Sequence, residues 1–470
     1  MSAQRKRSIL HRTVHISTVE GIYSQVFTTV AGPGSIFLTK FAVLLGATPF
    51  QFSLLAAIGQ LSQIFQPLGY ALTRQLTSRK GVVVRLTAVG RGLVFLLGVI
   101  PFLLYGEPAI QAFLFIFLAS ASLQAVGGNA WIAWISDIVP ERMRGRFFSW
   151  RFQALLLAGM VTGFALGAFI DLYEPEPGIV AEKFLSFIGN WTIFSPGNIA
   201  YAFALVFIVA GGFGLVGAKI LSTQPEHPKL QERAKFMPQL MVPLKDKNFR
   251  RLLVYSLWWM LAIGIGAPFW GPFMLKNLRM SLVNIQIYGA ISAVASLSAL
   301  RFWGLLVDRF GNKPVMRIIL VLGGINPMIW VFLTPDNYWF VYLEAVSSGV
   351  MWSGAGIVAT NLVLALAPKE QRQIYSGLFG AFSGLAIVVT MLLSGICMPP
   401  PVEILSLSLT GEQVLFGISG LARLTAQIPL SWIDEPRTRS VGAVLNYFLQ
   451  FTKLQITQFA EWIFRKNGRR

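Results

Sequence analysis

Charged side chains and cysteine are both scarce in this chain. Of its 470 residues, 13% are charged and 54% are hydrophobic, whereas about 25% of residues are charged in soluble domains. Cys397 is the single cysteine, which excludes an intramolecular disulfide and argues against a thiolate metal site. The three histidines lie outside the apolar runs. We therefore expect a membrane protein with no metal site and no cofactor.

Sequence motifs of soluble enzymes are missing as well. The chain has no phosphate-binding loop that ends in Gly-Lys-Ser/Thr, no metal-binding histidine pair and no nucleophile elbow. A membrane-embedded transferase would need clustered carboxylates near the membrane surface, and the predicted inner loops lack them. Residues 1–18 are polar and basic, so we expect no cleavable signal peptide. The chain is therefore not expected to be an enzyme.

Long apolar runs are what the sequence has instead. A membrane-spanning helix needs about 20 mostly apolar residues, and twelve such runs predict an all-α polytopic membrane protein. The last run is the weakest, because Arg423 interrupts it. The predicted spans lie near 20–45, 50–73, 84–105, 108–136, 147–172, 196–221, 250–275, 282–306, 315–334, 338–366, 374–397 and 406–428.

Polar stretches divide these runs into two halves. We predict an N-terminal six-helix bundle (1–222), a cytoplasmic linker (223–249), a C-terminal six-helix bundle (250–432) and a cytoplasmic tail (433–470). The apolar and basic residues of the tail indicate an amphipathic helix on the membrane surface, with docking to a partner as the alternative. An unusually long outer loop is expected at 173–195.

The basic residues predict the orientation. A net charge of +19 is by itself typical of nucleic-acid binding. With a cytoplasmic N-terminus, however, nearly all lysines and arginines fall in cytoplasmic segments, and the outer loops carry only Lys183, Lys276 and Arg279. This asymmetry satisfies the positive-inside rule. We therefore expect a multi-pass protein of the plasma (inner) membrane with both termini in the cytoplasm and no nucleic-acid partner.

Polar loops repeat between the two halves. The loop from Gly304 to Pro314 follows the predicted eighth span, and a longer, degraded copy at 69–80 follows the second, with Thr73 in the place of an aspartate. A second repeat follows the fourth and tenth spans at identical spacing: Pro140, Arg144 and Phe147, and Pro368, Arg372 and Tyr375. Two six-span halves with the same orientation are a known transporter architecture.

These loops resemble those of the major facilitator superfamily. Its pattern G-x-x-x-D-R-x-G-R-K is filled after the eighth span except at Asn312, and the loop from Asp137 to Arg146 resembles another element of the family. The resemblance implies two pseudo-symmetric bundles and loops that latch one conformation; plain anchoring of the inner face is the alternative. The implied gating residues are Gly304, Asp308, Arg309, Gly311, Lys313, Asp137, Arg144 and Arg372.

Two departures from the family concern energy coupling. Many proton antiporters of the superfamily carry R-x-x-Q-G in the fourth span, and here the stretch from Ala121 to Ala125 keeps only the glutamine. The fifth span has glycines at 159, 163 and 167, but Phe164 stands where the drug antiporters have a proline. Both departures weaken the assignment of a drug/proton antiporter, and the glycine ladder is expected to serve helix packing.

Polar and tryptophan residues inside the spans are candidates for a substrate cavity, because polar groups in a span turn away from lipid. Glu344 either faces substrate or carries a proton, or it lies solvated near the outer interface. Lys40 either pairs with Glu344 or extends outward to the interface, and Arg91 is expected to tie helices together. The candidates are Gln25, Gln63, Gln124, Asn129, Trp131, Trp258, Gln286, Glu344 and Asn361.

The leading hypothesis is a secondary active transporter that moves a small solute by rocking its two halves about a midplane site. Two alternatives stay open: a sensor or scaffold of the same fold, and a proton-independent facilitator or exporter. The expected partners are a small-molecule substrate, the lipid bilayer and a coupling ion, either a proton or sodium, and we expect a monomer. The sequence specifies neither substrate nor direction.

Overall fold

The computed structural model describes residues 3–66, 68, 78–176, 178–189, 193–226, 242–404, 407–435, 440–444 and 446, with side chains from Arg12 onward. Most of the predicted degraded loop copy, most of the linker and most of the C-terminal tail lie outside the described residues. The predictions for those segments are therefore untested.

The first half begins with a span that is broken into two helices. Pro33 lacks a backbone N–H and Gly34 has φ of +80°, so the chain turns there, and the Ser35 hydroxyl caps the next helix by accepting from the N–H of Phe37. The elements of this half are α1 (Ala3–Ala31), α2 (Ile36–Leu44), α3 (Pro49–Leu61), η1 (Ser62–Phe65), α5 (Lys80–Gly92), α6 (Val94–Leu103), α7 (Glu107–Ile138), α8 (Glu141–Asp171), α9 (Ile179–Ile188), η2 (Pro196–Asn198) and α10 (Ile199–Ser222).

The second half begins after the linker with an aspartate cap. The Asp246 carboxylate accepts hydrogen bonds from the N–H groups of Asn248 and Phe249. The elements are α11 (Val242–Lys245), α12 (Lys247–Gly266), α13 (Trp270–Pro272), the π-helical turn η4 (Phe273–Asn277), α14 (Leu282–Phe310), α15 (Asn312–Val331), η5 (Tyr338–Phe340), α16 (Val341–Leu366), η6 (Lys369–Gln371), α17 (Arg372–Ile396), β1 (Val402–Ile404), β2 (Leu407–Leu409), α18 (Gly411–Thr425) and α19 (Gln427–Ser431).

Two segments differ from the predicted spans. Strands β1 and β2 pair antiparallel with Val402 opposite Leu409, so the last span begins at Gly411 and the predicted start near 406 was wrong. A capping box between Thr410 and Gln413 fixes the true start. The outer segment 173–195, expected to be a loop, contains the helix α9.

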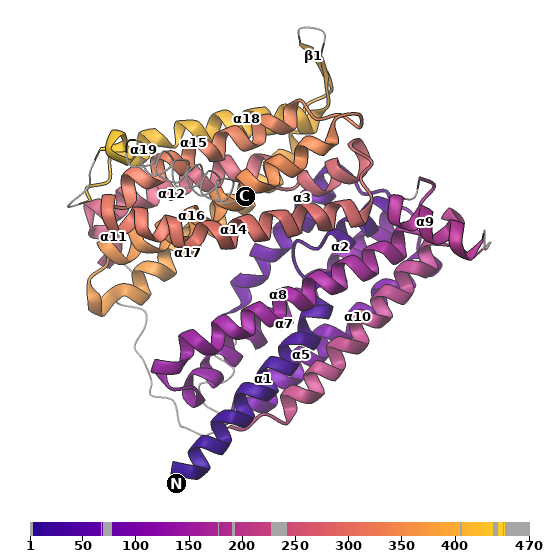
Figure 1. The fold of residues 1–470 in the computed structure, drawn as a ribbon, viewed down its shortest axis with the longest axis horizontal. Coiled ribbons are helices and arrows are strands. Elements are labelled where there is room, and N and C mark those ends of the chain that lie inside the picture. Colours follow the sequence, from indigo (N-terminus) through magenta and orange to yellow (C-terminus); the bar gives the residue numbers. More distant parts are fainter. Residues whose placement is uncertain are drawn as a thin grey trace, which may run out of the picture.

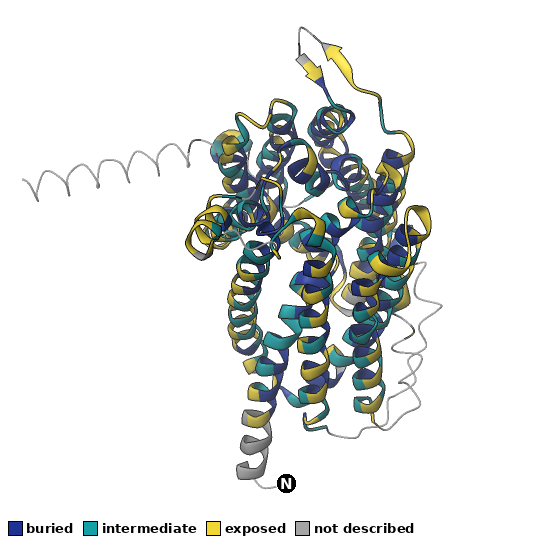
Figure 2. Ribbon diagram, turned by 90° about the vertical axis from the view of Figure 1, so that its right-hand side faces the viewer, coloured by how far each residue is buried: buried dark blue, intermediate teal, exposed yellow. Residues whose placement is uncertain are grey.

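Eleven helical segments of the described chain are long and apolar enough to cross a membrane. The predicted span near 50–73 begins with α3 and η1, and its later part lies largely outside the described residues. Large apolar side chains such as Phe115 and Ile208 are exposed on the outer surfaces of the helices, as expected where lipid surrounds them. Figure 2 shows this exposure along the helices.

The two bundles repeat the same helix packing. In the first, α1 packs against α8 and α10; in the second, α12 packs against α17 and α18 in the corresponding way. The bundles contact each other through α3 with α17, α8 with α14, and α2 with α13. We call the end that bears the β1–β2 hairpin and α9 the hairpin face, and the opposite end, with the 310–312 loop, the linker face. In Figure 1 the bundles approach each other at the hairpin face and diverge toward the linker face.

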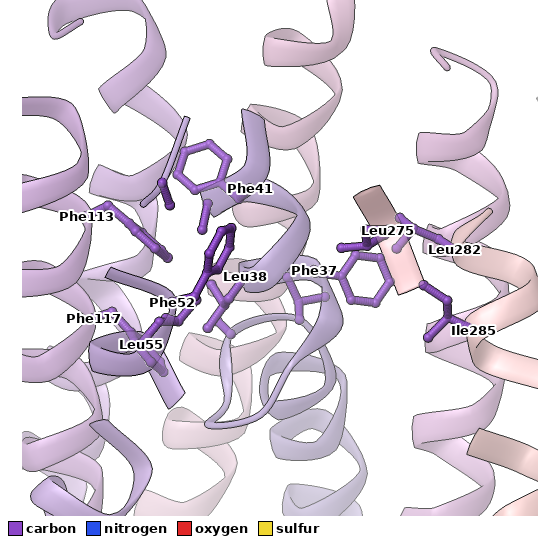
Figure 3. Packing of buried hydrophobic residues seen from close by; sticks show 14 of the residues in the cluster. Phe37, Leu38, Phe41, Phe52, Leu55, Phe113, Phe117, Leu275, Leu282 and Ile285 are labelled. Carbon is purple, nitrogen blue, oxygen red and sulfur yellow. The ribbon is translucent and has the colours of Figure 1, made fainter. Parts of the chain in front are cut away.

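Apolar side chains join the bundles near the hairpin face. Phe37 of α2 lies between the first bundle and Leu275 of the second (Figure 3). Other buried members of this cluster come from both halves: Leu38, Phe41, Phe52, Leu55, Phe113, Phe117, Leu282 and Ile285. Close packing here excludes water from the hairpin-face end of the interface between the bundles.

Candidate functional site

A central cavity of about 560 Å³ lies between the bundles. Gln25 and Thr28 of α1 line it from the first bundle, and Gln286 of α14 and Trp270 of α13 line it from the second. None of its lining residues is an aspartate, glutamate, lysine or arginine. The cavity therefore offers uncharged hydrogen-bonding groups and aromatic surface, which suits a small polar solute.

The glycine ladder of α8 brings Gln25 and Gln286 to this cavity. A Cβ at Gly159 would lie 3.0 Å from Nε2 of Gln25, a Cβ at Gly163 would collide with the Gln286 side chain, and Gly167 packs on Leu282. Glycine at these positions lets one face of α8 contact both α1 and α14 closely. The ladder thus serves packing, as expected, and that packing positions two of the candidate side chains.

A side cavity of about 330 Å³ adjoins the central cavity inside the second bundle. The two cavities share Ala267, Trp270, Met274 and Tyr288 as walls. The side cavity adds four polar residues, Asn326, Glu344, Ser348 and Arg423, and two tryptophans, Trp330 and Trp352. Charge is therefore concentrated on one side of the combined space.

Glu344 is the acidic group of this side cavity. Its side chain is buried (3% exposed), and its Oε2 accepts a hydrogen bond of 3.0 Å from the Tyr288 hydroxyl. Among the alternatives for this residue, the structure favours a cavity position over a solvated one at the interface.

Arg423 is the basic group, and sequence reasoning treated it only as a weakness of the last span. It is buried (2% exposed) and donates from one terminal nitrogen to the carbonyl of Gly323 at 3.2 Å. It interacts electrostatically with Glu344, but no nitrogen–oxygen distance between them falls within 4.0 Å. The signal that could have found it is its place within an apolar run, which marks functional charge by default.

A third cavity, of about 630 Å³, lies between the α3–η1 segment and α7 of the first bundle and α17 of the second. Gln60, Gln63 and Gln66 line it from the first half, together with Asn129 of α7. The Asn129 amide donates to the backbone carbonyl of Gln66 at 3.2 Å. Gln63 and Asn129 thus line the same cavity, but neither residue lines the central cavity.

Other candidates lie elsewhere. Gln124 packs against Gly90 of α5 and donates to Ser120, and Trp258 is exposed and donates to Thr425 at 3.0 Å. Asn361 is half-buried on α16. None of these side chains lines the central or the side cavity.

Trp131 belongs to a buried ionic cluster in the first bundle. The Arg151 guanidinium lies 4.8 Å from the centre of the Trp131 ring. Arg91 and Arg151 share Glu20 at 2.9 and 3.5 Å, and Arg91 also donates to Ser24 at 2.7 Å. Arg91 thus ties α5 to α1, as expected, through Glu20, a partner the sequence did not single out.

Lys40 does not pair with Glu344, which corrects one of the two alternatives for this lysine. It forms an ion pair of 2.7 Å with Glu174. Close by, the Asp171 carboxylate accepts backbone hydrogen bonds from Leu282 and Val283 at 2.8 and 2.9 Å. Asp171 ends α8 in the first bundle and caps α14 in the second, so it joins the two bundles at the hairpin face.

The Gly304–Pro314 loop is held within its own bundle. The Glu435 carboxylate accepts from the backbone N–H groups of Asn312 and Lys313 at 2.9 and 2.8 Å. The Lys313 ammonium donates to the carbonyls of Ser431 and Ile433 at 2.7 Å each. These contacts explain why the loop has a lysine at 313. The glycine at 311 is explained by its positive φ of 92°, which turns the chain into the start of α15.

The first bundle repeats this arrangement with Glu226. Its carboxylate accepts from the N–H groups of Arg79 and Lys80 at 2.6 and 3.1 Å, and the Lys80 ammonium donates to the carbonyl of Gln224 at 3.1 Å. In both halves a lysine therefore bonds the carbonyl two residues before the capping glutamate. Neither glutamate was singled out in the sequence, although each stands beside a proline just after a bundle's last helix.

The remaining gating candidates lie at the linker face. The Asp308 side chain is exposed at the end of α14, and Gly304 is half-buried one turn earlier. Arg309 is exposed and stacks near Phe310. Arg144 donates to the carbonyl of Val139 at 3.1 Å, and Arg372 is exposed at the start of α17. The Asp137 side chain lies outside the described set.

A fold of two six-helix bundles around a shared cavity defines a class of membrane transporters. The sequence model of the Major Facilitator Superfamily matches residues 22–391 and 260–444. The chain therefore belongs to the Major Facilitator Superfamily.

Curated relatives match only part of the chain. The multi-drug resistance efflux pump PmrA of Streptococcus pneumoniae is 30% identical over 121 residues, which are 23% of this chain and 28% of the pump. The class B tetracycline resistance protein of Escherichia coli is 27% identical over 146 residues, or 30% of this chain and 35% of that protein. The chain thus spans well under half the length of these relatives.

Solved structures match the fold along nearly the whole chain. The nucleoside transporter NupG covers 90% of this chain and 98% of its own, at 12% identity and a TM-score of 0.65. A D-xylose–proton symporter covers 92% of this chain and 99% of its own, at 16% identity and a TM-score of 0.61. At these identities the likeness concerns the fold alone, and it confirms the predicted twelve-helix, two-bundle architecture.

Proposed function

We propose that the protein carries a small solute across the membrane by alternating access, with the central and side cavities as its binding region. The observation that carries this proposal is a cavity lined from both bundles, whose hairpin-face end is closed by Asp171 and the Phe37 cluster. A cavity shared by two repeats changes its opening when one repeat rocks against the other.

The charge asymmetry supports the orientation in this proposal. The linker face carries the basic loops, so it faces the cytoplasm under the positive-inside rule. The conformation described here is then the one that opens toward the cytoplasm. Asp308, exposed at the linker-face end of α14, meets the start of α8 when that face closes, because α8 and α14 run antiparallel and Asp171 makes the equivalent contact at their other ends.

Glu344 supports coupling to protons. It is buried at the edge of the binding region and lies beside Arg423 without an ion pair, so its proton can exchange without breaking a salt bridge.

Blocking the central cavity tests the transport proposal. A Cβ added at Gly289 meets open space, and so does one at Gly212 of α10, away from the cavity. In proteoliposomes loaded with a panel of sugars, nucleosides, amino acids and drugs, we expect at least one solute to be carried by the wild type. Gly289→Trp should abolish that flux, and the matched variant Gly212→Trp should retain it. If no solute moves under any ion gradient, the protein is a sensor or scaffold.

Opening the hairpin face tests the conformational part. In a Cys397→Ser background, a cysteine at Thr28 lines the central cavity and should react slowly with an impermeant maleimide added from the hairpin face. Asp171→Ala removes the two hydrogen bonds that join the end of α8 to the start of α14 and should speed this labelling several-fold. Equal rates with and without Asp171 would contradict the idea that Asp171 holds this face closed.

A further inference from the structure

Two side chains that line the side cavity carry buried hydrogen-bond donors that have no partner. Nδ2 of Asn326 and Nε of Arg423 are both without a hydrogen bond, although the residues are only 3% and 2% exposed. The Asn326 oxygen accepts from Ser347 at 2.7 Å, and one terminal nitrogen of Arg423 donates to the carbonyl of Gly323. A guanidinium cannot accept a hydrogen bond. A ligand that satisfies these two donors must therefore supply a hydrogen-bond acceptor.

The charge of the cavity limits what that acceptor can be. Tyr288 of α14 and Arg423 of α18 are the titratable groups that line the cavity with Glu344. The cavity's other lining residues, including those from α12, α13 and α15, carry no charge. Two described charges of the neighbouring elements lie toward the hairpin face, Lys276 of η4 and Glu412 at the start of α18. The others lie in the linker-face halves of their helices: Lys247, Arg250, Arg251, Arg301, Asp308, Arg309, Lys313, Arg317 and Arg372. With Glu344 ionised, the cavity is neutral; a bound anion would make it negative, which is costly in a buried site.

We propose that the side cavity binds the carboxylate of an organic acid at Asn326 and Arg423, and that Glu344 takes up one proton when the acid binds. The proton comes from water at the open linker face and adds to a carboxylate oxygen of Glu344, while no covalent bond to the ligand forms. Arg423 then pairs with the bound carboxylate while Glu344 is uncharged, so the site stays neutral. This assignment rests on the proposed transport function and names its substrate class and coupling ion.

The walls of the cavity favour an acid with a ring. Trp270, Trp330 and Trp352 line it and offer aromatic faces. Benzoate, benzamide and benzylamine therefore make a matched set of probes, since they share a ring and present an anion, a neutral acceptor and a cation.

The test is calorimetric titration of the purified full-length protein with each probe, in two buffers of different ionisation enthalpy. We expect benzoate to bind at least about tenfold more tightly than benzylamine, with uptake of about one proton. Arg423→Gln should weaken benzoate binding at least about tenfold, and Asn326→Ala a few-fold. Glu344→Gln should bind benzoate without proton uptake. Arg251→Gln changes a half-buried arginine at the linker face; it is the matched control and should bind as the wild type does.

If Arg423→Gln does not fold, judged by size-exclusion chromatography, Arg423→Lys replaces it; this variant keeps the charge, lacks Nε and should bind benzoate more weakly. Preferential binding of benzylamine overturns the proposal, as does benzoate binding that is insensitive to residue 423 or that takes up no proton. Failure of all three probes to bind also overturns it. If a solute is carried and Gly289→Trp blocks it while benzoate does not bind, the transport proposal survives and this inference alone fails.

Discussion

The buried charges of the first bundle form ion pairs, whereas Glu344 and Arg423 of the second bundle do not pair with each other. In the first, Glu20 contacts both Arg91 and Arg151, and Arg91 makes further hydrogen bonds to Ser24 and to the carbonyl of Gly214. In the second, Glu344 and Arg423 lie beside a cavity without an ion pair. Directly paired charges resist change, whereas charges separated by an open space can exchange partners or protons. The first set is therefore structural and the second is the candidate for function.

The same helix contact underlies both sets. In the first bundle an arginine on α5, Arg91, donates to the α10 carbonyl of Gly214 at 3.0 Å. In the second, an arginine on α18, Arg423, donates to the α15 carbonyl of Gly323 at 3.2 Å. These are corresponding helix pairs, with the arginine supplied from opposite sides. Because Arg423 lies on α18, it both joins two helices and lines the side cavity.

The largest effect is expected from Glu20→Gln. The change leaves two buried guanidinium groups without their shared counter-charge, and loss of one partner of a buried ion pair costs about 3–5 kcal/mol. The free energy of unfolding in a denaturing detergent should fall by about that amount. Asp434→Asn, which breaks an exposed pair with Arg251, should change it by less than about 1 kcal/mol. If both variants lost less than about 1 kcal/mol, the ionic cluster around Glu20 would not have the structural role assigned to it.

An intermediate and equal effect is expected at the two capping glutamates. Glu226→Gln and Glu435→Gln each weaken two backbone hydrogen bonds to a carboxylate, and we expect each to lower the free energy of unfolding by about 1–2 kcal/mol. The same detergent titration measures both. Losses that differ by more than about 1 kcal/mol would show that the bundles are not energetically equivalent even where their contacts repeat.

The smallest effect on stability is expected from Glu344→Gln. The amide oxygen can still accept from the Tyr288 hydroxyl, so the free energy of unfolding should change by less than about 1 kcal/mol. Proton-driven uptake of the carried solute should nevertheless fall at least about tenfold, because the amide cannot take up a proton. A loss of stability comparable to that of Glu20→Gln, with flux retained, would instead give Glu344 a structural role.

The helical spans could be predicted because each one leaves a local signal. Runs of about 20 apolar residues need no partner to be seen, and the repeated loops showed that the halves correspond. The β1–β2 hairpin was missed because its residues Val402–Ile404 and Leu407–Leu409 are largely apolar and adjoin a genuine span. Only the pairing of the strands separates them from the helix that begins at Gly411.

The site could be predicted only in part. Gln25, Gln286 and Glu344 were singled out as polar residues in spans and do line the central or the side cavity. Gln124 and Trp258 met the same criterion and line neither, because a polar residue in a span can equally face a neighbouring helix. Arg423 was passed over because a charge in an apolar run lowers its hydropathy score without showing which space the side chain enters.

By itself the sequence determined the apolar spans, their division into two repeated halves and the asymmetry of basic residues, because each depends on local composition or on spacing along the chain. The tertiary structure decided which polar residues share a space. It joins α8 to both bundles through its glycines, pairs Lys40 with Glu174, and leaves Arg423 and Glu344 beside one cavity. Those outcomes depend on which helices pack together and at what rotation, and no local stretch of residues encodes either.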